Sequence, residues 1–396
     1  MRPVMQKPKR KRTERNPYLF LVAGIVIGII GASAIGVLFL FGVSSGEAII
    51  IEETRPIVEA PQPTAVPIEA QGIRPTPIAN QIQAATISQN GAYMATISVE
   101  SGVSHIYLNE IRVEDSLFGN KFLLYQANGY YNDIVFSPDG SKLIATVDNG
   151  SALLFDVASR TLIEEYAQIG GAAFTHDNQR LVLVGRATGI RVLDISGDAL
   201  TLVSNRMPEQ TDYTVGAVAI NPSNDLAIAF DERVEIFDLD NLATGSQVIE
   251  PNNGFVLDLA FHPRDPNTLA IGASGTYPNG GIVQIYDLSN SSRAQYDFGT
   301  RVFALAFSPN GEWLAVGGGE SGFAESKLIA FRWDAEDVIP PNAPSFYQSL
   351  VFEGHEHTIF DVAFTSEGYL LSTAWDGSVR LWELIPQSDA ISVYYP

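Results

Sequence analysis

The residues that could do chemistry in this chain are few, and most of them lie far apart in sequence. The chain of 396 residues has no cysteine, which excludes disulfides, thiol catalysis and cysteine-based zinc or haem sites. Of its five histidines, only His355 and His357 lie close together, and no carboxylate–histidine pattern beside them supports a metal site. The sequence therefore predicts no metal, no cofactor and no catalytic residue.

Two glycine patterns match motifs with known chemistry, but their surroundings differ from those motifs. Gly317, Gly319 and Gly322 match G-x-G-x-x-G after an expected strand. Nucleotide binding at such a motif requires a helix to follow, and residues 327–333 read instead as another strand. Residues 42–46 match G-x-S-x-G at the end of a long apolar stretch, where no strand-to-helix turn is expected. Neither pattern is expected to be catalytic, and the first is interpreted as a flexible loop.

The elements that position the remaining residues are short strands that recur along the chain. A first strand ends in a tight turn rich in Pro, Asp, Asn and Gly, as at residues 137–140 and 308–311. A third strand often closes on an acid, as at Asp156 and Asp287. Seven copies occupy about 315 residues, which is near the forty-odd residues of a four-stranded propeller blade. The predicted fold class is all-β, a seven-bladed β-propeller with four antiparallel strands per blade over residues 81–396.

The last copy, residues 354–383, resembles a WD40 repeat. It opens on Gly-His, has an Asp-Gly turn at 376–377 and ends on Trp-Glu at 382–383, where that family has its GH, its turn aspartate and its WD dipeptide, with Glu replacing Asp. The other blades lack the Gly-His pair. The resemblance implies a structural tetrad, in which a buried imidazole bridges a carboxylate and a hydroxyl, and the hydroxyl meets an indole N–H. Its members are His355, Ser372, Asp376 and Trp382.

The sequence allows two interpretations of how the expected ring closes and two of the aspartates at its channel. Either a strand at residues 390–395 completes the seventh blade, or a segment near residues 66–73 closes the ring as a clasp. Three aspartates hold equivalent places in their first strands and are expected at one mouth of the central channel, either solvated or around a cation. They are Asp133, Asp258 and Asp361.

Irregular loops and aromatic residues indicate a binding face. The loops between the second and third strands are lengthened at residues 273–281 and 317–326, and in a WD40-like propeller these loops share a face with the start of each first strand. Exposed aromatic side chains on a rigid scaffold are typical protein-binding anchors. The alternative is that about half of them pack between blades. The candidates are Tyr130, Tyr131, Tyr213, Phe255, Phe303, Phe360 and Trp375.

The amino terminus differs in chemistry from the repeats. Residues 1–17 form a basic tail, and residues 18–43 contain no charge and are almost wholly apolar. At about 1.5 Å per residue they would form a transmembrane helix of roughly 39 Å, enough to span a hydrocarbon core of about 30 Å. The prediction is an uncleaved signal-anchor with a cytoplasmic amino terminus and an exported propeller. Small residues at 43–45 leave a cleaved signal peptide open.

Small residues recur at every fourth position of that predicted helix, which lets two helices approach closely in lipid. They are Gly24, Gly28, Ala32 and Gly36. One interpretation is a homodimer through this stripe, and the other is a glycine-rich membrane helix that does not self-associate. Proline-rich residues 44–80 are predicted to form an extended linker.

The distribution of charge narrows the class of partner. Seven basic residues and one acid precede residue 43, which leaves 17 basic and 44 acidic residues in the rest, a net charge of −27. Because such a body repels phosphate backbones, no nucleic acid is expected as a partner. The predicted function is a membrane-anchored, extracytoplasmic scaffold or complex subunit that binds an envelope or membrane protein without catalysis. The alternative is a propeller enzyme, or a binder of a small ligand or metal, that uses the central channel.

Overall fold

The computed structural model describes most of the chain after residue 80 and two short segments before it. The described residues are 41–44, 47–50, 81–112, 117–128, 131–147, 150–197, 199–207, 214–244, 246–251, 254–275, 280–291, 293–320, 326–333, 349–384 and 392–394. The chain divides into two units, Met1–Ala60 and Pro61–Pro396.

The first unit contains an antiparallel strand pair, β1 (Phe41–Ser44) and β2 (Glu47–Ile50). β1 occupies residues 41–43, which the sequence assigned to the end of a helix. The prediction was wrong there, because this β-branched and aromatic segment pairs with the apolar residues of β2 across a small polar turn. The rest of the predicted helix, residues 18–40 with its small-residue stripe, lies outside the described residues. In the described part of the chain, no helix is long and apolar enough to cross a membrane.

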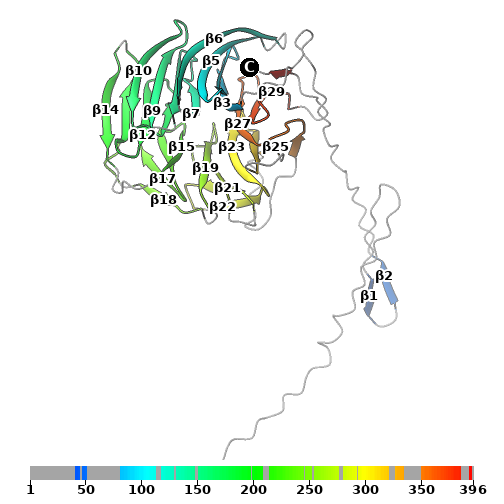
Figure 1. Cartoon of the computed structure of the whole chain (residues 1–396). Coiled ribbons are helices and arrows are strands. Elements are labelled where there is room, and N and C mark those ends of the chain that lie inside the picture. The colour runs from blue at the N-terminus through cyan, green and yellow to red at the C-terminus, as the bar shows by residue number, and fades with distance from the viewer. Residues whose placement is uncertain are drawn as a thin grey trace, which may run out of the picture. The chain divides into compact units, whose positions relative to one another are not determined.

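The second unit contains seven antiparallel sheets of four strands, each built in chain order (Figure 1). The first three blades are β3 (Gln81–Ile87), β4 (Tyr93–Glu100), β5 (Val103–Arg112) and β6 (Leu117–Asn128); β7 (Tyr131–Phe136), β8 (Lys142–Val147), β9 (Ser151–Asp156) and β10 (Thr161–Ala167); and β11 (Gly171–Phe174), β12 (Arg180–Gly185), β13 (Gly189–Asp194) and β14 (Thr201–Arg206). The next two are β15 (Val215–Ile220), β16 (Asp225–Phe230), β17 (Arg233–Asp238) and β18 (Gln247–Ile249); and β19 (Val256–Phe261), β20 (Thr268–Ala273), β21 (Ile282–Asp287) and β22 (Arg293–Asp297). The last two are β23 (Arg301–Phe307), β24 (Trp313–Gly319), β25 (Ser326–Arg332) and β26 (Ser349–Phe352); and β27 (Ile359–Phe364), β28 (Leu370–Ala374), β29 (Val379–Trp382) and β30 (Ser392–Tyr394). The predicted all-β, seven-bladed propeller is confirmed.

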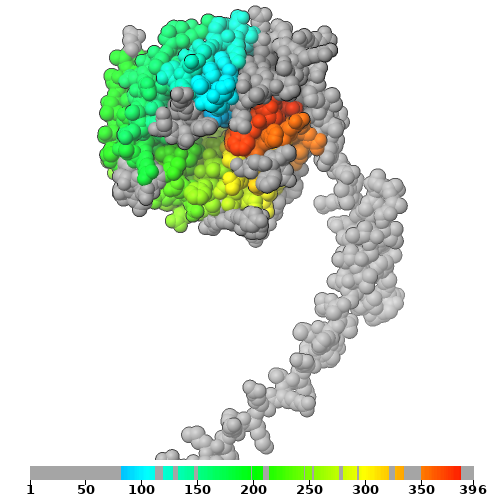
Figure 2. Space-filling model, in the orientation of Figure 1, coloured from blue at the N-terminus to red at the C-terminus, as the bar shows by residue number. Residues whose placement is uncertain are grey.

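The ring closes between the first and last blades without a shared sheet. β30 pairs with β29, so the carboxyl-terminal strand completes the seventh blade, as the first of the two closure alternatives predicted. Each inner strand packs against the inner strand of the next blade, and β27 packs against β3. Figure 2 shows the first blade (cyan) beside the last (orange to red). The segment proposed as a clasp, residues 66–73, lies outside the described residues.

The core lies between neighbouring blades, so the middle strands of each sheet are covered on both faces. The second strands accordingly are mostly apolar, and every residue of β20 is buried. The cluster that closes the ring joins Ile82 and Met94 of the first blade to Leu371, Val379 and Leu381 of the seventh. Apolar packing therefore holds the two ends of the ring together.

The glycine pattern beginning at Gly317 is explained by this packing. Gly317 lies in β24, and a Cβ atom there would lie 2.7 Å from Ile359 of the next blade. Gly272 holds the same place in β20, where a Cβ atom would lie 2.6 Å from Val302. The next element that the structure describes is the strand β25, so the described residues here offer no helix N-terminus to a phosphate. Gly322 lies outside the described residues.

Candidate binding site at the channel mouth

A β-bulge interrupts the inner strand at the same level in six of the seven blades described. The register shifts lie at Ile82/Ala84, Tyr131/Asp133, Val215/Val218, Val256/Asp258, Val302/Ala304 and Ile359/Asp361. Side chains in a regular strand alternate between its two faces, and an extra residue breaks that alternation. In consequence Phe360 and Asp361, which are consecutive in sequence, both line the centre of the ring, and so do Leu257 and Asp258.

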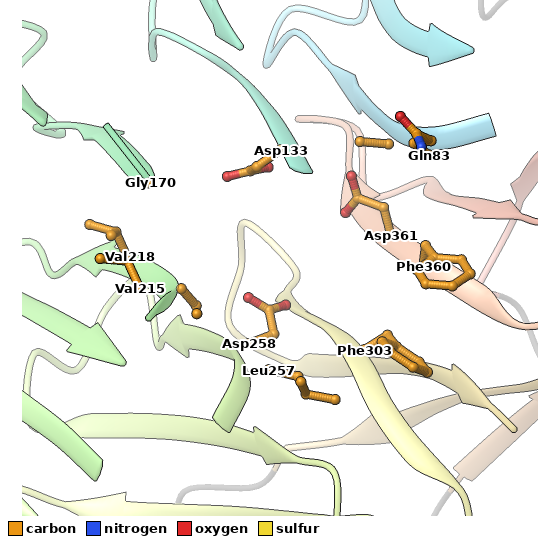
Figure 3. A pocket seen from close by; sticks show the side chains of 14 residues that line it. Gln83, Asp133, Gly170, Val215, Val218, Leu257, Asp258, Phe303, Phe360 and Asp361 are labelled. Atoms are coloured by element: carbon orange, nitrogen blue, oxygen red, sulfur yellow. The ribbon is translucent and has the colours of Figure 1, made fainter. Parts of the chain in front are cut away.

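The bulges surround a cavity of about 120 Å³ in the central channel, and all seven blades contribute to its lining. Figure 3 shows the carboxylates of Asp133, Asp258 and Asp361 pointing into this space, with the rings of Phe303 and Phe360 at one side. No lysine, arginine or histidine is among the described lining residues. The cavity is therefore acidic, and its own lining does not neutralise the charge.

Two of the three aspartates also tie one blade to the next. Asp258 accepts the Leu259 N–H at 2.8 Å through Oδ1 and the Leu305 N–H of blade six at 2.6 Å through Oδ2. Asp361 accepts the Ala85 N–H of blade one at 3.2 Å, across the closure of the ring. Asp133 accepts the N–H of its own neighbour Ile134 at 2.7 Å. These contacts explain the equivalent positions of the three carboxylates, which the sequence had indicated.

The pKa values of all three carboxyl groups are raised, chiefly because they are removed from bulk water. Burial raises the pKa of Asp258 to about 7, against the lowering effect of its two backbone hydrogen bonds, and the charge of Asp133 adds to the rise. Burial and then the charges of Asp133 and Asp258 raise the pKa of Asp361 well above its ordinary value. Burial likewise raises the pKa of Asp133. The cavity thus favours protonation of these groups or a compensating cation.

The geometry does not suit a single metal ion. Across the described residues, no group of three or more His, Cys, Asp or Glu side chains is placed to hold one. His355 is buried and His357 is exposed, so the histidine pair noted in the sequence does not converge. The three aspartates share a cavity without forming a common coordination site.

Three of the seven predicted aromatic anchors form one stack at the channel. The ring centroids of Phe303 and Phe360 lie 4.8 Å apart, and those of Phe360 and Trp375 lie 4.5 Å apart in a stacked pair. The backbone N–H of Trp375 donates to the Thr358 carbonyl at 3.1 Å, which fixes the loop from which the indole projects. All three side chains are partly exposed. The structure therefore presents a fixed aromatic surface that leads into the acidic cavity.

Of the other four predicted aromatic anchors, the structure describes the side chain of only one. Phe255 precedes β19 and is 54% exposed. Tyr131 begins β7, but its side chain is outside the described ones, and Tyr130 and Tyr213 lie outside the described residues altogether. Parts of the long loops at 273–281 and 317–326 are also outside them.

The four residues of the implied tetrad form one continuous set of hydrogen bonds in the seventh blade. His355 Nδ1 lies 2.9 Å from Asp376 Oδ2, and His355 Nε2 lies 2.8 Å from Ser372 Oγ. The Trp382 indole N–H donates to Ser372 Oγ at 2.8 Å. All donors and acceptors are matched when Nδ1 carries the imidazole proton and the Ser372 hydroxyl donates to Nε2.

The surroundings of the tetrad keep its imidazole neutral and its carboxylate ionised. Burial lowers the pKa of His355, although its hydrogen bond to Asp376 opposes this. Burial acts to raise the pKa of Asp376, but the His355 ring, the Ser378 hydroxyl and the Glu356 N–H together hold that pKa well below its ordinary value. Ser378 Oγ donates to Asp376 Oδ1 at 2.6 Å. Sequence reasoning missed Ser378, although a hydroxyl two residues after a turn aspartate is a known local signal.

Comparisons with known proteins agree with the fold. The repeat family described as "WD domain, G-beta repeat" matches residues 293–323 and 346–383. Transcription factor unc-37 of Caenorhabditis elegans is 26% identical over 211 residues, which cover 52% of this chain and 30% of that protein. Transducin-like enhancer protein 2 of Mus musculus is 26% identical over 216 residues, which cover 52% of this chain and 24% of that protein. The match therefore spans less than a third of either relative.

A solved structure supports the same architecture. A chain in "Crystal Structure of Mitotic Checkpoint Complex" aligns with a TM-score of 0.61 at 19% identity, covering 84% of this chain and 99% of that chain. At this identity the likeness concerns the fold. The protein is a seven-bladed β-propeller, and the match to the WD40 repeat family covers two of its segments.

Proposed function

We propose that the propeller is a non-catalytic interaction module that binds a protein partner at its channel mouth. The observation that carries this proposal is the stack of Phe303, Phe360 and Trp375 on a rigid ring. Aromatic side chains that are already fixed lose little conformational freedom on binding, and such residues supply much of the energy of protein interfaces. The likeness to a chain of a multiprotein complex supports the use of this fold as a subunit.

The enzymatic alternative has less support from the same site. An aspartate with a pKa of about 7 can act as a general base. However, the residues that line the described cavity include no serine, threonine, cysteine, lysine or histidine to serve as its nucleophilic partner. The carboxylates are also engaged in hydrogen bonds that join blades. We therefore assign them to binding and to the integrity of the ring.

Replacing Phe360 by alanine is expected to weaken binding of the partner by at least about 30-fold, because an anchor in the centre of an interface contributes about 2 kcal/mol or more. The partner is first obtained by affinity purification of the tagged full-length chain from its native cells, and its affinity is then measured with purified proteins. Trp375→Ala is expected to act in the same direction.

The matched control for this experiment is Leu202→Ala. Leu202 is 57% exposed on the outer strand β14, so the substitution removes a similar exposed apolar group far from the channel. Unchanged affinity for Phe360→Ala with an unchanged melting temperature, or an equal loss for Leu202→Ala, would show that the partner binds another surface.

We also propose that residues 18–40 anchor the chain in a membrane and that the propeller lies outside the cytoplasm, where it meets an envelope or membrane protein. The support is that these 23 residues carry no charge and follow a basic tail. The chain is expected to stay with membranes in alkaline carbonate and to be released by detergent. External protease is expected to digest the propeller in cells with an intact inner membrane. Release by carbonate, or protection from external protease, would contradict this proposal.

A further inference from the structure

We propose that the channel mouth recognises a lysine or arginine side chain of the protein partner, whose cationic head enters the acidic cavity while its aliphatic stem packs on Phe303 and Phe360. This inference rests on the proposed function, because it names the chemistry of the partner at the same site. It adds a specific requirement, which is that the partner presents a positive charge on an exposed loop or terminus.

The carboxylates of the cavity have no cationic partner among the described residues that line it. Asp133, Asp258 and Asp361 face one space, and no cationic residue is among the described residues that line it. The hydrogen bonds that Asp258 and Asp361 accept come from neutral backbone N–H groups. A cation entering the cavity would therefore relieve the repulsion between like charges in a place where solvent screens them poorly.

The size of the cavity and the spread of its carboxylates suit an organic cation. A volume of about 120 Å³ has room for roughly four water-sized groups. No three of the acids among the described residues converge on a point where a metal ion would sit. An ammonium or guanidinium group offers several N–H donors spread in space, so it can meet carboxylates that come from different blades.

Aromatic rings lie beside the carboxylates of the cavity. Phe303 and Phe360 line the cavity beside the carboxylates, and the Trp375 ring stacks on Phe360. Aromatic faces attract a desolvated cation through the ring quadrupole and also cover the methylene stem that carries it. The rings of Phe303 and Phe360 therefore suit the aliphatic stem of a lysine or arginine side chain, and the aspartates suit its cationic head.

The test uses N-acetyl-arginine amide as the probe and N-acetyl-citrulline amide as its neutral counterpart. The full-length chain has four tryptophans, so labelling with 5-fluorotryptophan gives four fluorine signals, and Trp375→Phe identifies the one at the channel mouth. We expect the arginine amide to shift the Trp375 signal in a saturable manner and the citrulline amide to leave it unchanged. Equal responses to the two probes would overturn the inference.

A variant that removes one carboxylate charge from the cavity tests the same inference independently. Asp133→Asn keeps an oxygen that can accept the Ile134 N–H, so it is the least disruptive change among the three aspartates. It is expected to weaken binding of the arginine amide by roughly tenfold, through the loss of one charge in a poorly screened site. Glu165→Gln, an exposed carboxylate on β10, serves as the control and is expected to have no effect. An unchanged affinity for Asp133→Asn would contradict the inference. The comparison of arginine with citrulline needs no variant and stands even if Asp133→Asn fails to fold.

The same variants separate this inference from the proposed function. If the purified partner loses affinity with Phe360→Ala but binds Asp133→Asn normally, the interaction face is right and the cationic side chain is wrong. If Phe360→Ala leaves the partner bound as before, the proposed function itself fails, whatever the arginine amide does.

Discussion

Replacing Asp376 by alanine is expected to lower the free energy of unfolding by about 3 kcal/mol, because partially buried donors lose a charged acceptor. Asp376 accepts hydrogen bonds from the His355 ring, the Ser378 hydroxyl and the Glu356 N–H. Without it the imidazole Nδ1 keeps only its contact with Ser378 Oγ at 3.1 Å and loses its charged acceptor, so the hydrogen bonds to Ser372 and Trp382 are less firmly oriented. Urea denaturation followed by tryptophan fluorescence measures the change, since Trp382 belongs to the tetrad.

The control for this prediction is Asp287→Ala. Asp287 ends β21 and, like Asp376, accepts a hydrogen bond from a serine hydroxyl; it also accepts one from an asparagine, but both partners are exposed to solvent. Water can replace those hydrogen bonds, so a loss of about 1 kcal/mol or less is expected. Similar losses for Asp376→Ala and Asp287→Ala would mean that the tetrad contributes no more than an ordinary turn.

The repeat architecture could be predicted from the sequence because each blade repeats the same local signals. A turn such as residues 137–140 is determined by its own residues, and the spacing between turns gives the number of blades. The outer strand predicted at residues 390–395 is present as Ser392–Tyr394, so the strand was predicted correctly but its ends were not. The strand β1 was missed because its apolar residues suit either a helix or a strand, and local composition does not decide between them.

The arrangement of the channel could be predicted only in part. The three aspartates were recognised from their equivalent positions, and Phe303, Phe360 and Trp375 were expected near one face. Nothing in the sequence indicated that Phe360 and Asp361 would turn toward the same space, because regular alternation places consecutive side chains on opposite faces. The bulge that brings them together arises from the packing of seven inner strands around one axis, which is a property of the assembled ring.

Raising the pH from 5 to 7 is expected to destabilise the native protein through Asp258. Its pKa is about 7 in the fold and about 3.9 in an unfolded chain, so between these values the native state holds a proton that the unfolded state has released. Stability from this group is therefore full at low pH and falls as pH rises, by at most about 1.4 kcal/mol per pH unit, until it levels off above pH 7. The raised pKa values of Asp133 and Asp361 act in the same direction. The lowered pKa of His355 acts in the opposite direction, since the stability it gives is lost as pH falls below about 6.5.

Asp258→Asn isolates the contribution of this carboxyl group from the others. The asparagine oxygen can accept one of the two N–H groups that Asp258 binds, so the variant is expected to be less stable than the parent at pH 5. That difference is expected to shrink by about 2 kcal/mol between pH 5 and pH 7, as the parent loses the stability that depends on its proton. The measurement is urea denaturation at intervals of half a pH unit. Asp287→Asn is the control, because the pKa of Asp287 is lowered and both states are already ionised across this range. Parallel stability curves for the parent and Asp258→Asn would show that the carboxyl group at the centre of the ring ionises as freely as one in water.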